Sequence, residues 1–245
     1  MAELFEASAW EKVWTYRDTF LLGLGNTVET ALLGLLLAFV LGAVFGLMAT
    51  SGVKALKAIS RIYVEIIQNT PLLLQLCFLY YAIAFAGASL GILYTGVLSL
   101  GIYHGAYVAE VIRAGIEAIP KGQFEAARSQ GFGYAGTMLY IILPQSIKII
   151  LPPMVNQVVN LIKNTSCLYI VGGADLISLT YSFVTGANTG GAYAPAYIVS
   201  GVMFFVICFP LSTLASRWEG SLKKRESRVA AAPKTSAEAR RGAAV

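Results

Sequence analysis

One face of an apolar segment carries side chains that could bind a polar solute. They recur at i, i+4, i+7 and i+8, the spacing of a single helix face, and are Asn156, Asn160, Lys163 and Asn164. Amides donate and accept hydrogen bonds, and an ammonium group donates to carboxylates. Because polar side chains within a membrane cost free energy unless they face a cavity or another helix, this face predicts either a substrate passage or hydrogen bonding between helices. In the first interpretation Asn160, Lys163 and Asn164 line the passage.

A second polar group surrounds Pro71. Asn69 and Thr70 directly precede this proline inside another apolar segment. A proline within a helix removes one backbone hydrogen bond, and here it is predicted to leave the carbonyl of Ile67 unpaired. Unwound backbone in a membrane can hold the charged ends of a zwitterion such as a free amino acid. Asn69 and Thr70 are therefore interpreted as part of the same substrate passage.

No set of residues typical of a catalytic site is present in the sequence. The single histidine, His104, has no acidic residue nearby in sequence and is interpreted as making one hydrogen bond between helices. Cys77, Cys167 and Cys208 are isolated, which is typical of packed small hydrophobes rather than of zinc ligands or a disulfide. No Gly-x-x-x-x-Gly-Lys-Ser/Thr phosphate-binding loop occurs. We therefore expect a chain that is not an enzyme and binds no cofactor itself.

The elements that must position these groups are membrane-spanning helices. The 245 residues are 57% hydrophobic and 13% charged, with a mean hydropathy of +0.68, which leaves too little polar surface to coat a water-soluble core. Apolar runs lie near residues 21–49, 59–86, 90–113, 149–170 and 193–215. The predicted fold is an all-α membrane protein with about five transmembrane helices and a long cytoplasmic loop between the third and fourth.

The distribution of basic residues predicts the orientation of these spans. Most of them follow the first, third or last span: Lys54, Lys57, Arg61, Arg113, Lys121, Arg128, Arg217, Lys223, Lys224, Arg225, Arg228, Lys234, Arg240 and Arg241. Only Lys12 and Arg17 fall on the other side. Because basic residues favour the cytoplasmic side, we expect the N-terminus outside and the C-terminus in the cytoplasm.

Three parts of the chain are predicted from this topology. Residues 1–19 form an external segment, residues 20–218 the five-span domain, and residues 219–245 a basic, disordered cytoplasmic tail. The basic cluster at residues 223–225 is interpreted as an anchor at the inner lipid leaflet rather than a nucleic-acid site.

Small residues mark one face of the first span. Ala38, Gly42 and Gly46 recur every four positions, which allows another helix to approach closely. The spacing predicts packing within a bundle or between subunits, although glycine is also common in membrane helices in general.

Charged pairs lie near the predicted inner ends of two spans. Arg61 and Glu65 are four residues apart in the second, and Glu110 and Arg113 three apart in the third. Both spacings bring side chains together on a helix surface, so both are interpreted as ion pairs.

The longest cytoplasmic connection, about residues 115–148, contains helical pieces. Residues 123–130 are predicted to form a short helix that ends at Gly131. Within it Glu125 offers a charge, while Ala126 and Ala127 are small enough to lie deep in a groove of a partner. Gly131 permits a sharp turn. The loop is therefore predicted to dock another protein.

The same residues resemble a family signature. Glu125-Ala126-Ala127, then Gly131, then residues 141–144 (Ile-Ile-Leu-Pro) match the cytoplasmic Glu-Ala-Ala signature of the permease subunits of ABC importers. Residues 68–76 and 106–113 are similar to the polar amino acid branch of these permeases, and the resemblance covers about residues 20–218. It implies a multi-pass protein of the bacterial inner membrane whose Glu125, Ala126, Ala127 and Gly131 couple it to a separate ATPase.

The resemblance also implies partners and a substrate class. The partners are a second permease subunit, identical or different, two ATPase chains that use the ATP, and an extracytoplasmic amino-acid-binding protein. Permeases for basic amino acids tend to carry an acidic residue at the position of Gln157, whereas residues 152–154 and 163–166 are similar to glutamate and aspartate permeases. An acidic or amide amino acid is therefore the expected substrate.

Two other functions compete with this one. A secondary amino acid transporter working without an ATPase would also need polar groups in the membrane, but five spans show no twofold internal repeat and the docking loop would have no purpose. A membrane-embedded enzyme would need a nucleophile, a base and an orienting group, and the sequence around His104 supplies no such set.

Overall fold

The structure is a computed structural model that describes residues 6–88, 90–187 and 191–230. Every regular element within those residues is a helix. In chain order they are α2 (Ala7–Thr15), α3 (Arg17–Thr50), α4 (Lys54–Gln68), α5 (Leu72–Phe85), α6 (Ile92–Glu117), α7 (Lys121–Ser129), α8 (Tyr134–Gly136), the π-helix η1 (Thr137–Ile142), α9 (Leu143–Asn164), the 3₁₀-helix η2 (Thr165–Val171), α10 (Leu176–Thr185) and α11 (Tyr193–Ala230). The predicted all-α fold is confirmed.

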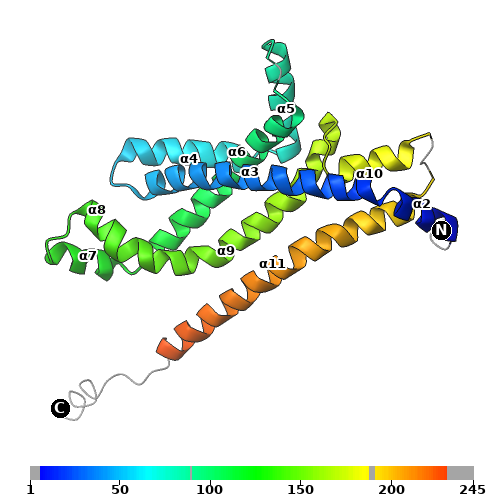
Figure 1. Ribbon diagram of the computed structural model, residues 1–245. Helices are drawn as coiled ribbons and strands as arrows, with labels where there is room; N and C mark the ends of the chain where they lie inside the picture. The colour runs from blue at the N-terminus through cyan, green and yellow to red at the C-terminus, as the bar shows by residue number, and fades with distance from the viewer. Residues whose placement is uncertain (1–5, 89, 188–190, 231–245) are drawn as a thin grey trace.

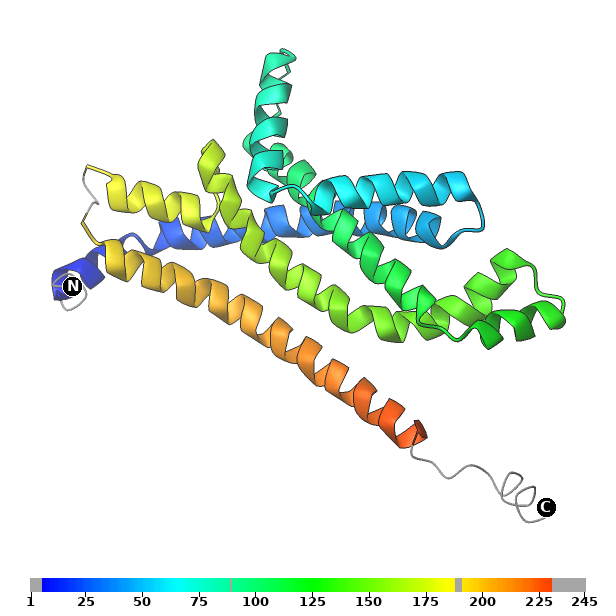
Figure 2. The ribbon, with the colours of Figure 1, turned by 180° about the vertical axis from the view of Figure 1, so that it is seen from behind.

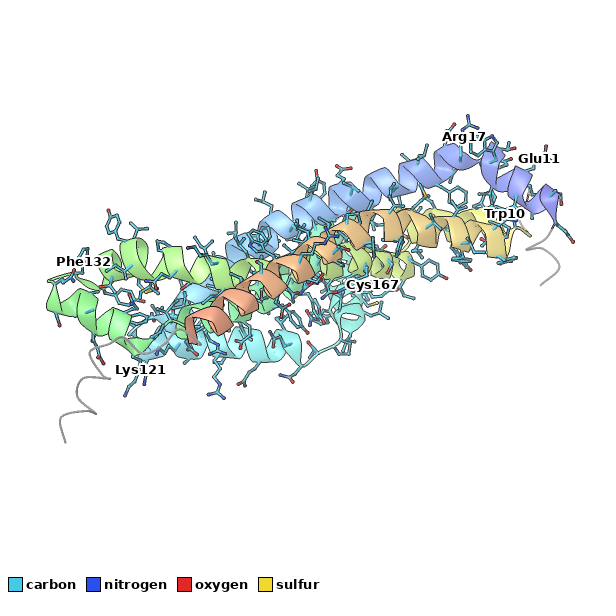
Figure 3. The ribbon with its side chains drawn as sticks, turned by 90° about the horizontal axis from the view of Figure 1, so that it is seen from below. Trp10, Glu11, Arg17, Lys121, Phe132 and Cys167 are labelled. Atoms are coloured by element: carbon cyan, nitrogen blue, oxygen red, sulfur yellow. The ribbon has the colours of Figure 1, made fainter. Side chains whose placement is uncertain are left out.

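The long helices lie side by side in one bundle. Figure 1 shows α2 and α10 at one end of this bundle and α7 and α8 at the other. Figure 3 shows the same separation in side chains, with Trp10 and Arg17 at one end and Lys121 and Phe132 at the other. We call these the α2 end and the α7 end.

The described residues contain four helical stretches that could span a membrane, and a fifth if the bent pair of α4 and α5 counts as one span. Four helical stretches are long and apolar enough to span a membrane: Arg17–Thr50, Ile92–Glu117, Tyr134–Val171 and Tyr193–Leu222. The contacts that fix the direction of α6 against α3 are Gly34 with Leu100, Gly42 with Val108 and Gly46 with Ile112. These pairs advance together, so α3 and α6 are parallel. The chain must return between them, and α4 runs back along α3. Counted with α5 as one broken span, it gives the expected number of about five.

The second span bends much more sharply than a proline kink. α4 ends at Gln68, α5 begins after Pro71, and their axes differ by 101°. A continuous span over residues 59–86 was the expectation, and it is corrected to two helices. Figures 1 and 2 show α5 projecting from the bundle, whereas α4 lies along α3. The predicted break at Pro71 is in the right place, but the deviation is too large for one bent helix.

Helix boundaries near the α7 end also differ from the expectation. The fourth span begins at Tyr134 rather than near residue 149, because η1 and α9 continue from α8 without a break. The loop expected at about residues 115–148 is thus mostly helical, and only short links flank α7. α11 extends to Ala230, so residues 219–230 are helical and not a disordered tail. Residues 231–245 lie outside the described part of the chain.

The α2 end is fixed by side-chain to backbone hydrogen bonds between α3 and α10. Asn26 Nδ2 donates to the carbonyl of Ala174 over 2.8 Å, and Thr27 Oγ1 accepts from the N–H of Leu176 over 3.0 Å. Asp175 caps α10 by accepting from the N–H of Ile177. Capping satisfies an N–H that a helix start leaves unpaired. The hydrogen bonds from Asn26 and Thr27 tie the start of α10 to the first span.

The small residues of α3 meet α6. Ala38, Gly42 and Gly46 are buried, and a Cβ atom added at Gly42 would lie 2.1 Å from Val108 Cγ1. No real Cβ fits at that distance. The predicted packing through this face is confirmed, within the bundle of a single chain.

Gly42→Ala should therefore destabilise the protein. Overpacking in a tight helix interface costs about 1–3 kcal/mol, so thermal unfolding in detergent should occur at lower temperature than for the wild type. Gly25→Ala is the matched control, because it lies in the same helix and has no neighbouring heavy atom within 4 Å of the added carbon. Equal unfolding temperatures for the two variants would show that the α3–α6 contact tolerates a wider spacing.

Candidate functional site

A polar cleft lies between α6 and the end of α9. It has a volume of about 490 Å³. Its lining residues are Tyr103, His104, Tyr107, Gln157, Asn160, Lys163, Asn164 and Ser166. The structure thus brings the three predicted residues of α9 into one cleft, together with aromatic and imidazole groups of α6. We call this the upper cleft.

His104 organises the wall of the upper cleft. Its side chain is buried, with 2% of its surface exposed. The Nδ1 atom lies 3.4 Å from Gln157 Oε1, and Asn164 Nδ2 lies 3.1 Å from Nε2. In this orientation of the Asn164 amide, the tautomer that satisfies both contacts carries its proton on Nδ1, which donates to Gln157, and accepts from Asn164 at Nε2. One hydrogen bond between helices was expected; the imidazole makes two and fixes both amides.

Lys163 and Asn160 project from α9 with exposed side chains. Within the part of the chain that the structure describes, no carboxylate forms an ion pair with Lys163. Its ammonium group is therefore available to a carboxylate from outside the chain. On the opposite wall Tyr103 and Tyr107 hold their hydroxyl groups 3.1 Å apart. The cleft offers hydrogen-bond donors and acceptors without a negative charge.

Asn69 and Thr70 do not join this cleft. Asn69 Nδ2 donates to the carbonyl of Glu65 over 2.8 Å, and Thr70 Oγ1 donates to that of Ile66 over 2.8 Å. Both side chains thus bond to the last turn of α4. Gln75 Nε2 donates to the carbonyl of Ile67 over 2.9 Å, so the unpaired carbonyl expected at the break is paired. In this chain Asn69 and Thr70 end α4 and do not line the upper cleft, so their role in a substrate passage stays a prediction.

The break nevertheless lies level with the upper cleft along α6. Gln68 Nε2 donates to the carbonyl of Ala106 over 3.4 Å, and Tyr63 donates to that of Ile102 over 2.7 Å. These contacts flank His104 in sequence but lie on another face of α6. α6 thus separates the upper cleft from the polar residues at the break between α4 and α5.

The candidate ATPase-coupling segment is α7 and the turn that follows it. Gly131 has a φ of +83°, and the N–H of Phe132 bonds to the carbonyl of Ala127 over 3.1 Å while that of Gly131 bonds to Arg128. This is the pattern of a Schellman motif, in which a left-handed glycine ends the helix. The predicted helix stop at Gly131 is confirmed.

Ala127 faces its own bundle and not the surface. Its side chain is 2% exposed, whereas Glu125 and Ala126 are exposed. The neighbouring Phe124 packs on a core that includes Met138. The expectation that both alanines enter a partner groove is corrected for Ala127, because its burial is already complete within this chain. Glu125 and Ala126 remain accessible to a partner.

The candidate coupling segment is tied directly to α9. Gln145 Nε2 donates to Gln123 Oε1 of α7 over 3.3 Å and to the carbonyl of Ile141 over 2.8 Å. A displacement of α7 would therefore pull on the start of the helix whose other end carries Lys163 and Asn164. Figure 1 shows α9 running from α7 toward the middle of the bundle.

Several site residues had weak or no signals in the sequence. Gln75, four residues after Pro71, pairs the carbonyl of Ile67 at the break. An amide side chain one turn after the proline could have predicted this hydrogen bond. Tyr103 and Tyr107 share a helix face, but the apolar residues around them in the sequence give no sign that this face is polar. Among the described residues, no group of three or more His, Cys, Asp or Glu side chains could hold a metal ion.

Comparison with known proteins identifies the family. The chain matches the model described as "Binding-protein-dependent transport system inner membrane component" over residues 38–224. It is 40% identical over 202 residues to the probable glutamine ABC transporter permease protein GlnM of Bacillus subtilis, covering 82% of this chain and 92% of that relative. It is 31% identical over 205 residues to the arginine transport system permease protein ArtQ of the same organism, covering 83% and 92%.

A solved structure of an amino acid ABC transporter with histidines superposes on 86% of this chain and 98% of its own, with a TM-score of 0.78 and 34% identity. This chain belongs to the family of inner membrane components of binding-protein-dependent transport systems, the permease subunits of ABC transporters.

Proposed function

We propose that this chain forms the translocation path of an importer for polar amino acids. The observation that supports the proposal best is the upper cleft, in which Lys163 offers an ammonium group for a carboxylate. The amides of Asn160 and Gln157 offer acceptors for a substrate ammonium group. A zwitterion needs both. Amino acid permeases among the relatives support the same class of substrate.

The proposed substrates are glutamate, aspartate and glutamine. The lining residues of the upper cleft include no carboxylate that could balance the side chain of arginine or lysine. Gln157 is neutral, and its Oε1 accepts from His104. Lys163 instead adds a positive charge, which favours a substrate with an acidic or amide side chain. The relative named for glutamine is consistent with this preference, whereas the relative named for arginine is less similar.

The proposed partners are a second permease subunit, two ATPase chains and an external binding protein. ATP is hydrolysed on the ATPase chains, and their closure moves α7, whose exposed Glu125 and Ala126 form the docking surface. The α7 end then lies in the cytoplasm and the α2 end outside, in agreement with Lys121 and Arg128 of α7 and with the preference of basic residues for the cytoplasmic side.

Lys163→Ala should reduce amino acid uptake into proteoliposomes supplied with the binding protein and the ATPase. Loss of a charge-assisted hydrogen bond, worth about 1.5–3 kcal/mol, predicts at least about a tenfold fall in transport at low substrate. Membrane insertion and ATPase association should persist. Lys54→Gln, at the exposed start of α4, is the control for removing a cation. Wild-type uptake by Lys163→Ala would leave this lysine without a role in the passage.

Competition against labelled L-glutamate tests the substrate class. Unlabelled aspartate, glutamate and glutamine should reduce its uptake, whereas arginine and histidine should not. Gln157→Glu should shift the pattern toward arginine, because it adds the missing negative charge beside the cleft. Strong competition by arginine or histidine in the wild type, without competition by the acidic and amide amino acids, would contradict the proposed preference.

Gly131→Val should uncouple the permease from its ATPase. A β-branched residue is strained at a φ of +83°, by about 1–2 kcal/mol or more, so the turn after α7 should shift. Gly122→Val is the matched control, because Gly122 lies in α7 with ordinary backbone angles and open space around it. Copurification of the ATPase and substrate-stimulated ATP hydrolysis should fall only for Gly131→Val. Undiminished values for both variants would show that this turn is not a coupling element.

A further inference from the structure

A second polar cleft lies between α4 and α6, nearer the α7 end. Its volume is about 520 Å³. The charged side chains that line it are Lys57, Arg61 and Glu65 of α4 and Glu110, Arg113 and Glu117 of α6. We call this the lower cleft. The charged pairs noted in the sequence therefore do not lie on separate lipid-facing surfaces; they face one another across one cavity.

The apolar face of α4 explains why the charges gather there. Ile59, Ile62 and Ile66 recur on the opposite face of α4 and are exposed. An amphipathic helix in a membrane turns such a face toward lipid and its polar face toward water or protein. The polar face of α4 lines the lower cleft. The lower cleft is therefore the polar region that the charged face of α4 meets.

The two walls carry opposite charges in excess. On the α6 wall Arg113 is shared by two carboxylates: its Nε lies 2.9 Å from Glu110, and its Nη1 lies 2.5 Å from Glu117. That wall keeps one negative charge in excess. On the α4 wall Arg61 pairs with Glu65 over 2.7 Å, and Lys57 adds one positive charge in excess.

A ligand with an ammonium group and a carboxylate carries the two charges that complement the excess charges of the walls. The ammonium group would bind the carboxylates of Glu110 and Glu117, whose two negative charges Arg113 only half neutralises. The ligand carboxylate would bind Lys57. The side chains of the ion pairs are one third exposed or more, so each contact is screened and weak. Weak binding is suited to a site on a transport path, because the transported molecule must leave it again.

One stripe of α6 connects this cleft to the upper one. Tyr103 and Tyr107 line the upper cleft, and Glu110 and Glu117 line the lower one. Their spacing of i, i+4, i+7 and i+14 places all four within one band of the helix surface. A polar molecule leaving the upper cleft toward the α7 end meets the carboxylate of Glu110 one turn later.

We infer that the lower cleft is a second, low-affinity site for the zwitterionic end of an amino acid on its way out of the upper cleft. The inference rests on the proposed transport function for its biological meaning, but the site itself is defined by Lys57, Glu110 and Glu117. The headgroup of phosphatidylethanolamine also pairs an ammonium group with an anion, in its case a phosphate, so the test separates the two ligands.

Cysteine protection measures occupancy of the lower cleft directly. Ala49 lines it and is uncharged, so Ala49→Cys is introduced after Cys77, Cys167 and Cys208 are replaced by alanine. The full-length chain, with its copurifying subunits, is placed in nanodiscs of phosphatidylglycerol without nucleotide. The rate of reaction with a cationic methanethiosulfonate is then measured with L-glutamine or with glutaramide, which has the same carbon chain but no ammonium or carboxylate group.

L-Glutamine should slow the reaction about threefold at twice its Kd, as simple competition requires, and glutaramide should not. Glu117→Gln should abolish this protection, and Glu110→Gln should weaken it as an independent second variant. Glu29→Gln, which removes an exposed carboxylate at the α2 end, should retain it. Equal protection by glutaramide, or full protection in Glu117→Gln, would overturn the inference.

Two further arms separate the alternatives. Protection should persist in Lys163→Ala, because the ligand reaches the lower cleft directly in a nanodisc; its loss there would overturn an independent site. Failure of the proposed transport function would instead appear as unchanged uptake in Lys163→Ala, with protection at Ala49→Cys unaffected. If added phosphatidylethanolamine slows the reaction and L-glutamine does not, the ligand is a lipid headgroup and the amino acid site is refuted.

Discussion

The close contact between α3 and α6 is the constraint on which the rest of the structure depends. Gly42 and Gly46 let the backbone of α3 approach Val108 and Ile112 without intervening side chains. α6 is thereby held at the centre of the bundle, where α4, α5 and α9 also contact it. Its remaining faces can then carry different chemistry, with His104 directed to one cleft and Glu110 to another.

Polar pairing decides where the helices of this bundle can break. The break at Pro71 frees a carbonyl that Gln75 pairs, and the π-helical turn before α9 is supported by Gln145 and Ser146, which donate to the carbonyls of Ile141 and Ile142. An unpaired carbonyl in hydrocarbon would cost several kcal/mol. Each irregular turn in these two places therefore comes with a side-chain donor one turn away. Ser99 and Thr137 are the buried hydroxyl groups in the described residues for which no such partner is present.

The periodicity of the sequence predicted which residues share a helix face, but not which other helix that face contacts. The stripe of Asn160, Lys163 and Asn164 and the small face of α3 follow from residue spacing alone, and both are faces that contact something specific. Spacing contains no information on which helix lies opposite. The second hydrogen bond of His104 and the orientation of Ala127 toward the core therefore required three-dimensional packing. For the same reason the proline predicted a break, whereas its 101° angle depends on how α5 packs against α6 and η2.

The openness of the upper cleft supports the proposed pairing of two permease subunits. Asn160 and Lys163 have exposed side chains in the single chain, although they lie in a helix that spans the membrane. A lysine facing lipid at the centre of a span costs about 2.5–3.5 kcal/mol, and an amino acid bound beside it would add its own desolvation. The single chain does not remove that cost, because the cleft between α6 and α9 leaves both side chains exposed. A second subunit placed over the same face would exclude lipid and leave a hydrated passage between the two chains.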